Sequence, residues 1–173
     1  PVARLYGLCT DDSVLGSWFY VMEMVEGRIF WDARFPDVSR EDRPAYFDAM
    51  NATIAALHGV DYKAVGLEDY GKPGNYFARQ IGRWSRQYLE DADAGRDPDM
   101  DRLVEWLPAN IPDGDETSIV HGDFRLDNMI LDPVGARMRA VLDWELSTLG
   151  DPMADFSYLL IAWVIPASLR NGL

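Results

Sequence analysis

Eight consecutive residues carry the most information in this chain, and they read His121-Gly122-Asp123-Phe124-Arg125-Leu126-Asp127-Asn128. Apolar runs flank them on both sides, Ser118 to Val120 before and Met129 to Leu131 after, and each run predicts a short strand. A third apolar run, Ala140 to Leu142, ends directly before Asp143. Polar residues therefore stand at the ends of neighbouring predicted strands. We expect those at positions 123, 128 and 143 to meet at one point that is open to solvent.

The residue types in these loops fit phosphoryl transfer. That reaction needs a carboxylate to orient and deprotonate the attacking hydroxyl, and oxygen ligands to hold Mg²⁺ on the phosphates. Asp123 is the candidate base. Asn128 and Asp143 are the candidate metal ligands, because Mg²⁺ prefers hard oxygen donors and takes few of them from the protein. Glu145 is a further candidate, either directly or through a water molecule.

Two other residues of the loop complete the candidate catalytic set. His121 is expected to brace the loop by hydrogen bonds rather than to shuttle a proton. Arg125 is expected to contact the transferred phosphate through its guanidinium group. Asp and Asn are also common turn and cap residues, so the alternative is that these side chains only shape loops. Their spacing between predicted strands favours the catalytic interpretation.

The pattern H-x-D-x-x-x-x-N, followed by D-x-E on the next strand, resembles the aminoglycoside phosphotransferase and choline kinase family. The turn Gly150-Asp151-Pro152, the position of Asp155 four residues beyond Asp151, and the segment Tyr20 to Gly27 are similar to that family too. The branch that also occurs fused to acyl-CoA dehydrogenases is the most similar, on three further segments: Gly71, Arg79-Gln80 and Arg83-Trp84.

The resemblance implies an α+β, protein kinase-like fold. Residues 1–27 would form the end of a small β N-lobe, with a hairpin and a hinge, and residues 28–173 a mostly helical C-lobe that carries the catalytic and metal loops. The resemblance also implies that Mg²⁺ is the metal ion and that ATP or GTP is the phosphoryl donor. The backbone at about Glu23 and Met24 would contact the adenine or guanine of that nucleotide. A further implication is that Asp155 anchors the backbone of the catalytic loop.

The family's phosphate-covering loop and strand lysine would precede the first residue of this sequence. We therefore expect the chain to be a fragment that lacks the first part of the N-lobe and is inactive, or nearly so, by itself. Three functions are compatible with these residues: a phosphotransferase acting on a small-molecule hydroxyl, a non-catalytic pseudokinase binding module, and a metal-dependent hydrolase. The last has a poor ligand set, because the chain contains only two histidines.

Local patterns predict the remaining elements. Val2 to Leu8 and Trp18 to Val25 are rich in β-forming residues and predict two antiparallel strands around a polar turn. Apolar periodicity and cap residues predict four helices: Ser39 to His58, Asn75 to Leu89, one capped by Asp99 that runs through Leu107, and one that begins at Asp151-Pro152.

Composition limits the partners. A net charge of −13 repels phosphate backbones and anionic lipids, so neither nucleic acid nor a membrane is expected to bind. The single cysteine, Cys9, cannot form an internal disulfide, which favours a reducing compartment, and a cytoplasmic location is expected. The partner is a small-molecule hydroxyl substrate, whether aminoglycoside-like, choline-like or hydroxyacyl-like. The sequence leaves that choice and the oligomeric state open.

Overall fold

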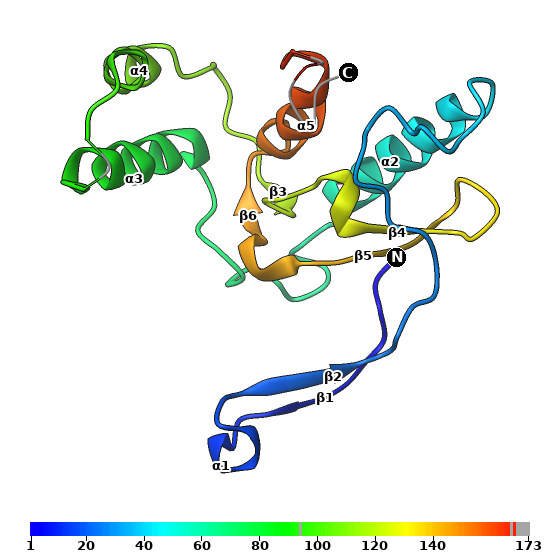
Figure 1. Ribbon diagram of the computed structural model, residues 1–173. Coiled ribbons are helices and arrows are strands. Elements are labelled where there is room, and N and C mark those ends of the chain that lie inside the picture. The colour runs from blue at the N-terminus through cyan, green and yellow to red at the C-terminus, as the bar shows by residue number, and fades with distance from the viewer. Residues whose placement is uncertain (94, 167, 169–173) are drawn as a thin grey trace.

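The computed structural model describes residues 1–93, 95–166 and 168 (Figure 1). Strands β3 to β6 lie close to the loop of residues 121–128, and the longer helices lie around them. The strands are β1 (Leu5–Cys9), β2 (Phe19–Met22), β3 (Ser118–Val120), β4 (Met129–Leu131), β5 (Met138–Val141) and β6 (Thr148–Gly150). The helices are α1 (Asp12–Leu15), α2 (Arg43–His58), α3 (Tyr76–Glu90), α4 (Pro98–Ala109) and α5 (Pro152–Leu160), with 3₁₀ turns η1 (Leu126–Asn128), η2 (Trp144–Leu146) and η3 (Ile161–Trp163).

The first two strands form an antiparallel hairpin, as the sequence predicts. The polar turn between them contains α1, which Asp11 caps by accepting a hydrogen bond of 2.9 Å from the backbone N–H of Ser13. Figure 1 shows the hairpin projecting away from the helical part of the molecule. Its start is tied to the rest of the chain because the N–H of Val141 in β5 donates to the carbonyl of Pro1 at 3.0 Å.

The remaining strands form two small antiparallel sheets, β3 with β6 and β4 with β5. Three of these strands match the predicted ones, although β5 begins two residues earlier than expected and ends at Val141. The sequence did not predict β6. Its three residues show no alternation of their own, and they are a strand because Ser118 pairs with Gly150 and Val120 with Thr148. Tertiary pairing decides such a short strand.

The four predicted helices are present, two of them with other N-termini than predicted, and the short α1 was not predicted. α2 starts at Arg43 rather than at Ser39, because Pro44 fits only the first turn of a helix. α4 starts at Pro98, and its cap is Asp97, which accepts from the N–H groups of Asp99 and Met100. The prediction that Asp99 is the cap was wrong by two residues. α5 has the expected cap, Asp151, followed by proline. Within the described residues, no helix combines the length and apolarity needed to span a membrane.

The core includes apolar residues of the loop 121–128 and of the strand that follows it. Phe124, Met129 and Leu131 are fully buried, and Leu126 is nearly so. These side chains pack with α2 and α5 in one apolar cluster that includes Phe35, Tyr46, Met50, Ile54, Val141 and Leu159. Buried apolar residues therefore alternate with polar ones along the loop. Packing of the apolar set fixes where the polar set points.

Gly27 lies at the junction between the hairpin and the helical part. The next residue, Arg28, exchanges backbone hydrogen bonds of 2.8 and 2.9 Å with Leu131 of β4. A Cβ atom on Gly27 would overlap the carbonyl oxygen of Leu131 and the Cγ2 atom of Ile130. The close approach of the two backbones thus depends on glycine.

We predict that Gly27→Ala lowers the free energy of unfolding by about 2 kcal/mol, because β4 must move to admit the methyl group. Chemical denaturation measures this loss. Gly7→Ala is the matched control, since a Cβ atom at Gly7 meets nothing within 4 Å. Equal stabilities of the two variants would contradict the close packing at Gly27.

Candidate active site

His121 is the first residue of the candidate catalytic loop, residues 121–128, and is fully buried. Its Nε2 lies 2.9 Å from the carbonyl oxygen of Leu142, and its Nδ1 accepts from the N–H of Asp123 at 3.2 Å. The proton therefore sits on Nε2, because a carbonyl oxygen only accepts. The ring also packs edge-on against Trp144, with centroids 4.7 Å apart. With both nitrogens engaged inside the protein, His121 braces the loop, as the sequence predicts.

Asp155, on the first turn of α5, holds the backbone of the same loop. Its carboxylate accepts from the N–H of His121 at 2.5 Å and from the N–H of Gly122 at 2.7 Å. His58, at the end of α2, contacts it through Nε2 at 3.2 Å. The carboxylate is 2% exposed, so all of its partners come from the protein. The anchoring role that the resemblance implied is present in the structure.

Asp123 and Asn128 are joined directly. The Nδ2 group of Asn128 donates to the backbone oxygen of Asp123 at 3.0 Å and to its Oδ2 at 2.9 Å. Both amide hydrogens are thus committed to one residue. No hydrogen bond to the amide oxygen of Asn128 occurs within the described part of the chain. That oxygen is held in one direction and remains free to accept.

Arg125 lies at the rim of the loop, with its side chain 44% exposed. Its Nε contacts Asp123 Oδ2 at 3.0 Å and its Nη1 contacts Asp127 Oδ2 at 3.2 Å. Partial burial acts to lower the pKa of Arg125, but the two carboxylates outweigh this effect and raise the pKa above its usual value. Asp127 had no predicted role, and the structure shows that it helps to hold Arg125.

Asp143 follows β5 in a left-handed conformation, with φ of +66° and ψ of +58°. Few residues other than glycine adopt this conformation, and such strain is common at functional sites. The preceding residue, Leu142, donates its N–H to the carbonyl of Asn128 at 2.8 Å and accepts from His121. Asp143 therefore directly follows the residue whose backbone is hydrogen-bonded to Asn128. Its side chain is exposed, as is that of Glu145.

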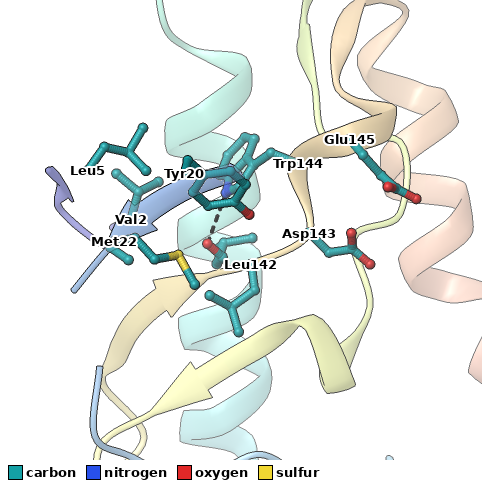
Figure 2. A pocket seen from close by; sticks show the side chains of 10 residues that line it. Val2, Leu5, Tyr20, Met22, Leu142, Asp143, Trp144 and Glu145 are labelled. Carbon is teal, nitrogen blue, oxygen red and sulfur yellow. Dashed lines mark hydrogen bonds between the residues drawn. The ribbon is translucent and has the colours of Figure 1, made fainter. Parts of the chain in front are cut away.

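A pocket of about 580 Å³ separates this site from the hairpin (Figure 2). In Figure 2 the carboxylates of Asp143 and Glu145 lie on one side, and Tyr20 and Met22 of the hairpin on the other. The part of the pocket lining between these two pairs of side chains is apolar. The lining residues are Val2, Ala3, Leu5, Tyr20, Met22, Val141, Leu142, Asp143, Trp144 and Glu145.

The expected hinge residues lie just outside this pocket. The backbone N–H of Glu23 donates a hydrogen bond of 2.8 Å to the carbonyl oxygen of Arg4. The side chain of Met24 is 83% exposed. Neither residue lines the pocket, whereas Met22 does. A contact between Glu23 or Met24 and a nucleotide base stays a prediction.

The donor set suits a hard cation. Within the described residues, no group of three or more His, Cys, Asp or Glu side chains is arranged to hold a metal ion. The available donors are the free amide oxygen of Asn128 and the exposed carboxylates of Asp143 and Glu145. Mg²⁺ commonly takes one or two protein oxygens and completes its shell with phosphates and water. These residues fit that ion.

Sequence reasoning missed one residue at this site. Tyr158 on α5 lines a small cavity with Arg125 and Asp127, and burial, followed by the influence of the Asp123 carboxylate, raises the pKa of its hydroxyl group. The apolar periodicity of α5 points to packing and says nothing about this cavity. The one available signal was the spacing of three residues between Asp155 and Tyr158, which places both on one helix face.

A comparison with protein families gives a match to the phosphotransferase enzyme family over residues 1–172. Acyl-CoA dehydrogenase family member 11 of Gallus gallus is 47% identical over 172 residues, which cover 98% of this chain and 22% of that protein. Acyl-CoA dehydrogenase family member 10 of Mus musculus is 45% identical over 168 residues, covering 97% of this chain and 16% of that protein. The chain thus spans about a fifth of the length of the curated relatives it matches.

Solved structures share the fold. A crystal structure of a Ralstonia eutropha protein superimposes with a TM-score of 0.92 at 55% identity, over all of this chain and 53% of that chain. A thermostable aminoglycoside phosphotransferase in ternary complex with ADP and hygromycin B gives a TM-score of 0.64 at 15% identity, over 91% and 54% of the two chains. The GDP complex of an aminoglycoside 2'-phosphotransferase gives 0.67 at 16% identity, over 93% and 55%.

These matches confirm the predicted α+β, protein kinase-like fold and the similarity to the branch found in acyl-CoA dehydrogenase family members. The chain belongs to the phosphotransferase enzyme family.

Proposed function

We propose that this chain supplies the catalytic loops of an enzyme that transfers the γ-phosphoryl group of a Mg²⁺-nucleotide to a hydroxyl group of a small molecule. One observation carries the proposal: the amide nitrogen of Asn128 donates to Asp123 while its amide oxygen stays free, and the backbone carbonyl of Asn128 accepts from the N–H of Leu142, the residue before Asp143. The proposed base is thereby joined directly to one proposed ligand, and the backbone that carries the second ligand is paired with the same residue. Aminoglycoside-like, choline-like and hydroxyacyl-like acceptors all fit this chemistry.

The residues of the loop have different proposed roles. Asp123, with its side chain 17% exposed, accepts the proton of the incoming hydroxyl. Arg125 places a cation beside that carboxylate, where charge on the transferred group can be balanced. His121 keeps the loop in position through its two ring nitrogens and takes no part in proton transfer. This arrangement supplies position and charge, which phosphoryl transfer chiefly requires.

Asn128 and Asp143 would hold Mg²⁺, with Glu145 as a direct or water-mediated support. When bound, the ion neutralises charge on the nucleotide phosphates. The residues themselves contribute rigidity: Asn128 is 8% exposed and fixed by Asp123, and the left-handed backbone at Asp143 turns its side chain out of the strand.

The pocket beside Asp143 is the proposed nucleotide site, with ATP or GTP as the donor. Its apolar wall offers a surface for a planar base, and Glu23 and Met24 would meet the base through their backbone. The ADP and GDP complexes among the structural neighbours support a nucleotide in this fold. We accordingly assign residues 1–27 to the end of an N-lobe and residues 28–173 to the C-lobe.

The test is phosphoryl transfer by the full-length protein. We expect γ-labelled nucleotide to pass its label to at least one member of a panel of hydroxylated metabolites, in a reaction that requires a divalent ion. Free phosphate without a labelled acceptor would instead identify a hydrolase. Nucleotide binding without any turnover would identify a binding module.

We predict that Asp143→Asn raises the Mg²⁺ concentration for half-maximal activity by 10-fold or more, because the amide offers the ion no negative charge. A Mg²⁺ titration of the initial rate measures the change. Asp132→Asn is the matched control, since Asp132 faces Arg137 and Arg139 on the β4–β5 turn. An unchanged Mg²⁺ requirement in Asp143→Asn would remove this residue from the metal site.

A further inference from the structure

The chain between β5 and η2 turns at Asp143, where the backbone is left-handed. Aspartate can adopt this conformation when its short side chain forms a local hydrogen bond that offsets the strain. Here the carboxylate makes no capping hydrogen bond to η2, the turn that it precedes. The left-handed backbone of Asp143 must therefore be held by neighbouring residues.

The next residue, Trp144, reaches back across this turn. Its indole Nε1 donates a hydrogen bond of 2.9 Å to the carbonyl oxygen of Val141, which lies two residues before Asp143. The bond closes a short loop of chain with Asp143 inside it. Figure 2 shows this bond as a dashed line, with the indole ring and the carboxylate of Asp143 pointing in opposite directions from the chain. The carboxylate is thereby directed away from the closed loop.

We propose that Trp144 is a positioning residue of the metal site, whose indole N–H holds Asp143 in its left-handed conformation and so directs the carboxylate toward the ion. This inference rests on the proposed function, in which Asp143 is a ligand of Mg²⁺. The indole has no oxygen to offer the ion, so Trp144 acts through Asp143.

The backbone hydrogen bonds around Asp143 do not replace this contact. Leu142, before it, is paired with Asn128 and His121. After it, the carbonyl of Trp144 accepts from the N–H of Ser147 at 3.0 Å. Each of these bonds fixes one side of the turn. The indole bond differs because it connects the two sides.

Packing keeps the indole ring in the position that this bond requires. One part of the ring meets His121 edge-on, with centroids 4.7 Å apart and an angle of 61° between the planes. The ring is partly buried against the apolar core, and it also lines the pocket of about 580 Å³. Because His121 belongs to the catalytic loop, the same ring links that loop to the backbone of the proposed metal ligand.

Removal of the indole N–H without a change of shape tests the proposal. Site-specific replacement of Trp144 by benzothienylalanine puts a sulfur atom in the place of that group. In the full-length protein we expect the affinity for Mn²⁺, in the presence of a non-hydrolysable nucleotide analogue, to fall about 10-fold, as is usual when a residue that orients a metal ligand is changed. Electron paramagnetic resonance measures the free Mn²⁺. Unchanged affinity would overturn the positioning role, because a residue needed only for packing keeps its shape here.

Trp144→Phe provides a second variant, which keeps an aromatic ring and also lacks the N–H group. We expect the same loss of Mn²⁺ affinity. Trp106→Phe is the matched control, since Trp106 is exposed on α4, outside the site. A loss as large in Trp106→Phe would show that the effect is not specific to Trp144.

A double-variant experiment asks whether the effect passes through Asp143. Asp143→Gly removes the carboxylate, and glycine adopts the left-handed backbone without strain. In that background Trp144→Phe should change the affinity for Mn²⁺ by about twofold at most, because residues that act through one contact are not additive. Equal losses in both backgrounds would refute a role through Asp143.

The two proposals fail in different ways. If Asp143→Gly weakens Mn²⁺ binding and the benzothienylalanine variant does not, the proposed metal ligand survives and the role of Trp144 is wrong. If Asp143→Gly leaves Mn²⁺ binding intact, the proposed function loses this ligand. A crystal structure of Trp144→Phe then still tests the conformational part: we expect φ of Asp143 to leave the positive region, and a retained positive φ would overturn the inference.

Discussion

Asp123→Asn should lower kcat for phosphoryl transfer about 1,000-fold, with little change in the KM for nucleotide. Asparagine has nearly the same shape and can still accept hydrogen bonds through one oxygen. It cannot take a proton, and a positioned base contributes roughly 10²- to 10⁴-fold to the rate of such reactions. Loss of kcat alone indicates an interaction that operates in the transition state.

Steady-state kinetics of the full-length protein, with any acceptor that accepts label, measure this effect. Asp99→Asn is the control: it makes the same chemical change at a carboxylate that is 79% exposed on α4 and pairs only with Arg102 in the described structure. A variant at position 123 that keeps more than a tenth of the wild-type kcat would show that another group removes the proton.

Asp155→Ala is expected to destabilise the protein by about 3 kcal/mol and to abolish most activity. The substitution leaves the buried N–H of His121, and the N–H of the exposed Gly122, without their acceptor, and a buried N–H without a partner costs about 1–3 kcal/mol. It also removes the partner of His58. The catalytic loop would then lose its attachment to α5, and Asp123 its fixed position.

Hydrogen–deuterium exchange tests this most directly, because the two amides should exchange slowly in the wild type and rapidly in the variant. Asp151→Asn provides the matched control on the same helix. Asp151 caps α5 by accepting from the N–H of Met153 at 2.9 Å, and asparagine is an equally good cap. Continued protection of His121 and Gly122 in Asp155→Ala would refute the anchoring role.

Much of the fold could be predicted because the informative signals are local. The hairpin, β3, β4 and four of the helices follow from runs of three or more residues with clear patterning. Helices α2 and α4 begin a few residues away from their predicted starts, as expected where several polar residues could act as the cap. β6 could not be predicted because its only stabilising feature is its pairing with β3, about 30 residues earlier.

The candidate site divides in the same way. Asp123 and Asn128 were placed together because five residues of a single loop separate them, and the structure joins them by hydrogen bonds. The direction of Asp143 depends on a left-handed backbone that no local pattern indicates. The cavity that Tyr158 of α5 lines with Arg125 and Asp127 joins two distant segments, and no periodic pattern in the sequence indicates it.

The sequence by itself determined which chemical groups are available and which of them share a loop, since strand ends and short spacings are local properties of the chain. The tertiary structure decided how that loop is held. Packing of α5 against β3 brings Asp155 to the loop backbone. Such contacts depend on burial shared between distant segments, and the energy of that burial is not encoded in either segment alone.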